Sequence, residues 1–151
     1  MRDILFKAKR IDNGEWVEGF VSYPHSTDTE KGVESYYFME VDERGWYSQC
    51  VVSANTICQY PGLTDKNGNK IWENDILSIA KSVDVVSGNY FYPPISYPAN
   101  VKVKWDLCAW MWETISKNKY YIGFPDAWCH YEAEVIGNIF DNPELLEGGA
   151  S

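Results

Sequence analysis

The stretch Gln59 to Ala80, QYPGLTDKNGNKIWENDILSIA, decides how the rest of this chain is arranged. It opens as the end of a strand and breaks at Pro61-Gly62, a pair that suits a type II turn. Asp65-Lys66-Asn67-Gly68 predicts a second reversal, because Asn and Gly tolerate the positive φ that a tight turn needs. A third turn at Glu73-Asn74-Asp75 leads into a strand that begins at Ile76. The stretch therefore predicts a scaffold of short strands, and it contains no catalytic signature.

Similar turn signals divide the rest of the chain. Asp12-Asn13-Gly14 and Asp42-Glu43-Arg44-Gly45 each separate two strand-like segments, so we expect hairpins over residues 3–23 and 33–53. The polar residues 24–32 predict a loop between these hairpins. Further strands are expected at 101–105, 107–115, 120–124 and 132–140; a short helix is the alternative for 107–115.

This pattern of short strands predicts a mainly β fold, built as SH3-like or irregular antiparallel barrel units. The SH3 comparison rests on the Glu-Asn-Asp-Ile turn and is an analogy. Asn142 and Pro143 predict a short C-terminal helical turn, and residues 148–151 a disordered tail. At 151 residues we expect a single domain over 1–147, with two closely packed small barrels as the alternative.

Three blocks of the sequence carry a resemblance to a known family. Gln59 to Ile76 shares the pattern Gln-Tyr-x-Gly-Leu-x-Asp-Lys-Asn-Gly-x-Lys-Ile-x-Glu-x-Asp-Ile, and Ile4 to Gly19 and Val135 to Leu146 match an opening and a closing block. In these blocks the chain resembles the YopX family of phage and prophage proteins. It departs from the usual pattern at Asn74, where Gly is common. The resemblance implies a phage or prophage origin and brings no established biochemical activity with it.

Composition restricts the compartment and the classes of function. Apolar residues make up 45% of the chain and aromatic residues 16%, which is typical of a folded globular protein. No long uncharged apolar run predicts a membrane span, and the early charges of the N-terminus do not fit a signal peptide. We therefore expect a cytoplasmic protein of the bacterial host. The net charge of −9 disfavours general binding to duplex nucleic acid.

The chain offers few residues suited to catalysis or metal binding. His25 and His130 are its only histidines, and neither lies in a recognisable nucleophile motif. Cys50, Cys58, Cys108 and Cys129 form no Cys-x-x-Cys pair, so we expect reduced, buried thiols. The sequence predicts no enzyme, no metal site and no cofactor.

A crowded aromatic segment is the first candidate interaction site. Its candidate residues are Tyr90, Phe91, Tyr92, Ile95 and Tyr97; Pro93 and Pro94 lie among them, and Pro98 follows. The prolines exclude a helix interior and a central strand. Two interpretations stay open: a lid over the protein's own core, or a contact surface that makes the protein a homo-oligomer or binds a phage or host protein.

Two basic pairs at strand spacing are the second candidate. Lys7 with Lys9 and Lys102 with Lys104 would form a positive ladder if their strands were neighbours. Trp105 could add stacking on single-stranded bases. This hypothesis of a nucleic-acid-binding accessory protein competes with a simpler one, the ordinary polar outer face of an antiparallel sheet.

Overall fold

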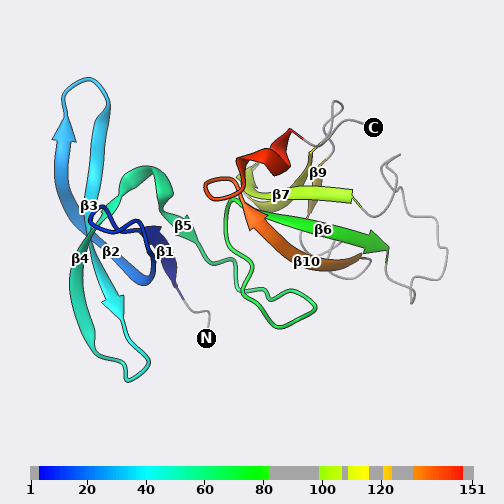
Figure 1. Ribbon diagram of the computed structural model, residues 1–151, viewed down its shortest axis with the longest axis horizontal. Coiled ribbons are helices and arrows are strands. Elements are labelled where there is room, and N and C mark those ends of the chain that lie inside the picture. Colours follow the sequence, from blue (N-terminus) through cyan, green and yellow to red (C-terminus); the bar gives the residue numbers. More distant parts are fainter. Residues whose placement is uncertain (1–3, 82–98, 107–108, 116–120, 124–130, 148–151) are drawn as a thin grey trace. The chain divides into compact units, whose positions relative to one another are not determined.

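The strands form two antiparallel sheets in the computed structural model, which describes residues 4–81, 99–106, 109–115, 121–123 and 131–147. The chain divides into two compact units, Met1–Tyr60 and Pro61–Ser151, and each contains one five-stranded sheet (Figure 1). Helical structure in the described residues is confined to two 3-10 turns, Ala54–Thr56 and Pro143–Leu146. The prediction of a mainly β chain with a short C-terminal helical turn is thus confirmed.

The expected domain boundaries stay predictions. Both units lie within the expected domain over residues 1–147, and each sheet belongs to one unit alone. The expected tail, 148–151, lies outside the described residues.

The N-terminal unit has the strand order β4-β3-β2-β1-β5. Its strands are β1 (Phe6–Lys9), β2 (Trp16–Asp28), β3 (Gly32–Val41), β4 (Tyr47–Ser53) and β5 (Cys58–Gln59). Both predicted hairpins are present, and Gly14 and Gly45 take positive φ in their turns. An isolated bridge from Arg10, just after β1, to Val52 in β4 shows that the sheet curls back on itself. Within the described residues it stays an open, irregular unit, and the SH3-like comparison stays an analogy.

The prediction of a loop over residues 24–32 is wrong. β2 continues through Asp28 and β3 begins at Gly32, so the polar segment is mostly strand. The β1–β2 ladder ends where Phe6 meets Gly19, which leaves the later part of β2 on an edge of the sheet. The register with β3 shifts on both sides of Pro24. Proline is compatible with strands at edges and bulges, because no ladder hydrogen bond is lost there.

One face of this sheet forms the core of the N-terminal unit. Ala8, Val17, Phe38 and Val52 are buried, with Cys50 beside them. Gly19 lies between β1 and β3 on the same face, opposite Phe6 and Glu40. A Cβ at this position would lie directly against the carbonyl oxygen of Met39, so the backbone approach requires glycine.

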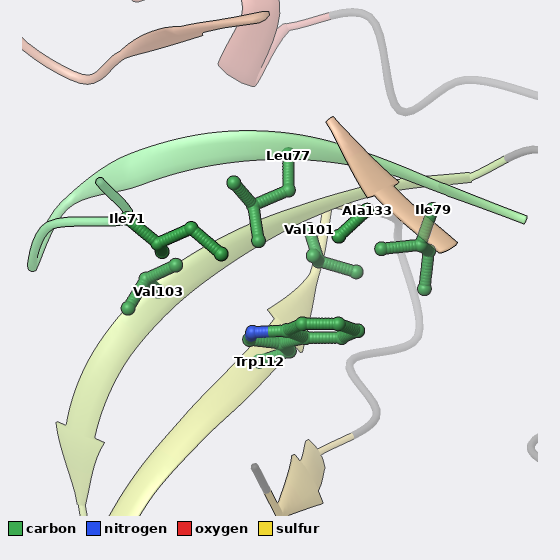
Figure 2. Packing of buried hydrophobic residues seen from close by; sticks show 7 residues of the cluster. All are labelled: Ile71, Leu77, Ile79, Val101, Val103, Trp112 and Ala133. Carbon is green, nitrogen blue, oxygen red and sulfur yellow. The ribbon is translucent and has the colours of Figure 1, made fainter. Parts of the chain in front are cut away.

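The second unit has the strand order β10-β6-β7-β8-β9. Its strands are β6 (Asp75–Lys81), β7 (Ala99–Asp106), β8 (Ala109–Thr114), β9 (Tyr121–Gly123) and β10 (Tyr131–Asn138). The segment 107–115, left open between strand and helix, contains the strand β8. Figure 2 shows the core of this unit, in which the ring of Trp112 lies under aliphatic side chains from several strands. The buried cluster consists of Ile71, Leu77, Ile79, Val101, Val103, Trp112 and Ala133.

The stretch 59–80 is held in place by a buried carboxylate. Asp65 is only 4% exposed, and it accepts hydrogen bonds from the backbone N–H groups of Asn67, Asn69 and Val135, all at 2.9–3.0 Å. Burial alone would raise the pKa of this carboxyl, but the hydrogen bonds outweigh burial and the net pKa is lowered. Because Val135 lies in β10, the carboxylate ties the turn to the edge strand of the sheet.

The third predicted turn is also confirmed. Asn74 has a φ of 68°, and its backbone N–H donates to the carbonyl of Val103 at 2.9 Å. Asp75 accepts a hydrogen bond from the backbone N–H of Trp72 at 2.9 Å, and this hydrogen bond lies within the turn.

Candidate interaction surface

Strands β3 and β4 of the N-terminal sheet carry no charged side chain on the outer face of the sheet. Along β3 and β4, Phe38, Cys50 and Val52 face the core, so the residues between them face outward. Phe20 of β2 lies opposite Met39, which lies opposite Gln49. The outer aromatic face is defined by Phe20, Tyr23, Tyr37, Met39, Val41, Tyr47, Gln49 and Val51.

This face lacks the charges that an exposed sheet face normally carries. In β3 and β4, all of whose residues are described, none of the outward positions from Ser35 to Val41 and from Tyr47 to Ser53 is charged. Tyr47 is 63% exposed, Tyr23 57% and Phe20 38%. An antiparallel sheet with one face on the core usually has a polar outer face, and contiguous exposed apolar groups mark interaction sites.

Ring contacts order one end of the outer aromatic face. The rings of Tyr23 and Tyr37 lie 4.7 Å apart between centroids, and His25 meets Tyr37 edge-on at 4.8 Å. Nδ1 of His25 lies 3.1 Å from the hydroxyl oxygen of Ser35. Because Ser35 is only 2% exposed, this hydrogen bond joins β2 to β3 and does not present a nucleophile to solvent.

The β3–β4 turn presents an aromatic residue at the other end. The Asp42 carboxylate accepts hydrogen bonds from the backbone N–H groups of Trp46, at 3.0 Å, and Arg44, at 2.8 Å. These hydrogen bonds hold the pKa of Asp42 below its ordinary value. Trp46 is 71% exposed and directly precedes β4. The ordered turn thus places a Trp, a residue type frequent in binding hot spots, beside Tyr47.

Lys7 and Lys9 share this side of the sheet. The ammonium nitrogens of Lys7 and Lys9 lie 4.4 Å and 5.3 Å from the ring centroid of Trp16, both within cation–π range. Glu18 lies directly opposite Lys7 on the neighbouring strand. The positive charge of Lys7 and Lys9 is therefore confined to the surroundings of Trp16, and Glu18 lies beside it.

The two basic pairs do not lie on neighbouring strands of one sheet. Lys7 and Lys9 lie in β1 of one sheet, and Lys102 and Lys104 lie in β7 of the other, whose neighbours are β6 and β8. Nζ of Lys104 is 2.9 Å from a carboxylate oxygen of Glu113, which the sequence did not reveal as a partner.

Trp105 is also placed differently from the expectation. Strand alternation puts it on the face of Val101 and Val103, opposite to Lys102 and Lys104. It is 54% exposed and meets Trp110 edge-on at 5.2 Å. Lys102 and Lys104 therefore lie on one face of β7 and Trp105 on the other, and the nucleic-acid-binding alternative stays a prediction.

The first candidate segment, with Tyr90, Phe91, Tyr92, Ile95 and Tyr97, lies outside the described residues. The outer aromatic face was not predicted from the sequence. One signal was available: Tyr36 to Met39 places aromatic or apolar residues on both faces of a strand, where a half-exposed strand would alternate with polar residues.

The described residues contain no group of three or more His, Cys, Asp or Glu side chains that could hold a metal ion. The side chains of Cys50 and Cys58 are buried, and burial raises the pKa of the Cys50 thiol. Cys108 and Cys129 lie outside the described residues.

Comparison with models of known protein families shows to which family the chain belongs. The family model described as YopX protein matches residues 5–147, which is nearly the whole chain. The chain belongs to the YopX family. The match contains all of β1 to β10, so both sheets of this YopX chain belong to the family's common region.

Two other comparisons add little to the YopX assignment. The search of curated proteins finds no match. The crystal structure of protein EF1440 from Enterococcus faecalis is similar with a TM-score of 0.49 and 19% identity, over 97% of this chain and 99% of that one. Among the described residues of this YopX chain, no helix is long and apolar enough to cross a membrane.

Proposed function

We propose that this YopX-family chain is a non-enzymatic accessory protein of phage or prophage origin that works in the host cytoplasm as a protein-interaction or self-assembly module. The outer aromatic face is its contact surface. The partner is a second copy of the chain or a phage or host protein.

The uncharged outer side of β3 and β4 carries this proposal. A chain with a net charge of −9 has many acidic side chains with which to cover an exposed sheet face, yet these strands place none there. Tyr and Phe suit such a surface because they bring a large apolar area with few rotatable bonds. The rings of Tyr23 and Tyr37 are already in contact, so they lose little conformational freedom on binding.

The test compares two surfaces of the same protein. The change Phe20→Ser with Tyr47→Ser removes two exposed rings from the outer aromatic face, and Trp105→Ser removes an exposed ring from β7 as the matched control. We expect the first variant to have the molar mass of a monomer in light scattering, or to lose partner proteins that copurify with the wild type from the host. The control should keep both, and equal behaviour of the two variants would contradict the proposal.

The aromatic segment at 90–97 is a second proposed contact, supported by its composition. Replacing Tyr90, Phe91 and Tyr92 together with Ser separates the two interpretations of the segment. A contact role predicts lower mass with an unchanged melting temperature. A lid over the protein's own core predicts a lower melting temperature with unchanged mass. A monomeric wild type would end the self-association part of this proposal.

A nucleic-acid-binding accessory protein is the alternative, and one observation favours it. Lys7 and Lys9 flank Trp16 on the outer side of β1 and β2, where phosphate contacts and base stacking could combine. The acidic net charge opposes it. Retention of single-stranded DNA or RNA that falls with added salt, and that Lys7→Ala with Lys9→Ala removes, would establish this alternative.

A further inference from the structure

Strand β4 is an edge of the N-terminal sheet (Figure 1), and within the described residues part of its backbone has no strand beside it. The carbonyl of Val51 points away from β3, because it accepts a hydrogen bond from the N–H of Ile11 at 3.0 Å. Backbone direction alternates along a strand, so the N–H and C=O groups of Tyr47 and Gln49 also point outward. Within the described residues neither position has a backbone partner on that side.

The open part of this edge is short and unprotected. Arg10 and Ile11 cover β4 at Val51 and Val52, which leaves Tyr47 to Gln49 open. Natural edge strands are usually shielded by a charge, a proline or a bulge. The exposed edge of β2 has Pro24 and several register shifts, whereas β4 pairs with β3 in regular register and has no charge or proline.

We propose that β4 pairs antiparallel with β4 of a second copy, around a two-fold axis at Ser48. In this register Tyr47 of each copy lies opposite Gln49 of the other, and their outward N–H and C=O groups exchange four backbone hydrogen bonds. A pairing register centred nearer to Val51 is excluded, because the outward carbonyl of Val51 already accepts a hydrogen bond from Ile11. The five-stranded sheet then continues across the axis into the sheet of the second copy. This inference rests on the proposed self-assembly function and names its site.

Charge explains why a second copy fits this edge. Two chains of net charge −9 repel each other, and this repulsion is weakest where the contacting strands carry no acidic side chain. From Trp46 to Ser53 the chain has no charged residue. Pairing also brings the two outer aromatic faces into one continuous surface, and Tyr47 lies at the junction. A backbone contact of this length alone would be transient, so the aromatic side chains must add apolar area.

A charge exchange at Ser48 tests the register. Ser48 is exposed, and in the proposed pair its side chain lies directly opposite Ser48 of the second copy. Like charges directly opposite are destabilising and opposite charges are stabilising. We expect Ser48→Lys alone and Ser48→Asp alone to halve the light-scattering mass of the wild-type dimer. An equimolar mixture of the two variants should restore the dimer mass. Thr27→Lys and Thr27→Asp, at an exposed position of β2, are the matched controls and should stay dimeric.

The following results would overturn the proposed β4 pairing. Single Ser48 variants that stay dimeric, or a mixture that stays monomeric, exclude pairing around Ser48. Unfolding midpoints equal to wild type show that a lost dimer is not a lost fold. If the Ser48 variants stay dimeric while Phe20→Ser with Tyr47→Ser gives monomers, the inference fails and the proposed function stands. If the wild type is monomeric at all concentrations and the outer-face variant changes no partner, both fail.

Discussion

Asp65 joins local and long-range structure in a single side chain. It accepts backbone hydrogen bonds within its own turn and from Val135, seventy residues away in the chain. Replacing Asp65 with Ala leaves buried backbone donors unpaired, and we expect a loss on the order of 2–4 kcal/mol in the free energy of unfolding. Denaturant melts measure this. Asp28→Ala, which removes a carboxylate with two local, solvent-exposed backbone hydrogen bonds, is the control and should change little.

The pH dependence of stability follows from the same group. The pKa of Asp65 is lower in the folded protein than the ordinary value of about 3.9. Its contribution is therefore complete above that ordinary value and is lost as the pH falls through the lowered, folded-state pKa. In Asp65→Asn, the free energy of unfolding should therefore fall less steeply with decreasing pH in the acidic range, as denaturant melts at neutral and acidic pH would measure. An unchanged acid limb in the variant would contradict the assignment.

Asn74 tests the turn before β6. It takes a φ of 68°, where Gly is freer than Asn and a β-branched residue is strained. We expect Asn74→Gly to be neutral or slightly stabilising and Asn74→Val to cost about 1–2 kcal/mol. Both variants keep the backbone hydrogen bonds of residue 74 to Val103 and Ile139, so the comparison isolates backbone conformation. Equal denaturation midpoints would show that the turn does not depend on this φ.

Among the elements, β2 and β3 approach each other too closely at Gly19 for a side chain to fit. Gly19→Ala would place a methyl group against the Met39 carbonyl, and backbone must move to admit it. We expect the free energy of unfolding to fall by about 1–3 kcal/mol or more, as it does when extra atoms are forced into a packed site. Gly32→Ala is the contrast, since that position has open space and only its φ of 81° opposes a side chain. Urea melts that rank Gly32→Ala as the more damaging change would refute the crowding argument.

Turn chemistry made the elements predictable, and tertiary pairing limited the prediction. Asn13-Gly14 and Arg44-Gly45 fix hairpins through local backbone preferences, which one sequence displays directly. The loop expected at 24–32 failed for the opposite reason. Whether Pro24 interrupts a strand depends on where β1 ends, and that is a property of the sheet and not of the local sequence.

For the whole molecule, the candidate surface depended on which strands became neighbours. The alternation of Lys102, Lys104 and Trp105 was visible in the sequence, but their pairing with β8 and the ion pair with Glu113 were not. Likewise, Phe20, Met39 and Gln49 form one row only because three strands align in a specific register. Sheet membership therefore separates the two basic pairs and creates the outer aromatic face.

The acidic net charge gives the two proposed functions opposite responses to salt. Two chains of charge −9 repel each other, and at about 0.15 M salt charges more than about 8 Å apart are largely screened. Raising the salt concentration from low values should therefore strengthen self-association through an uncharged contact. Binding of single-stranded nucleic acid should weaken, with a logarithmic slope of about −0.7 for each phosphate contact. Light-scattering mass and oligonucleotide binding across one salt series measure both responses. A mass that falls with salt would contradict an uncharged contact, because only opposite charges across the interface are weakened by screening.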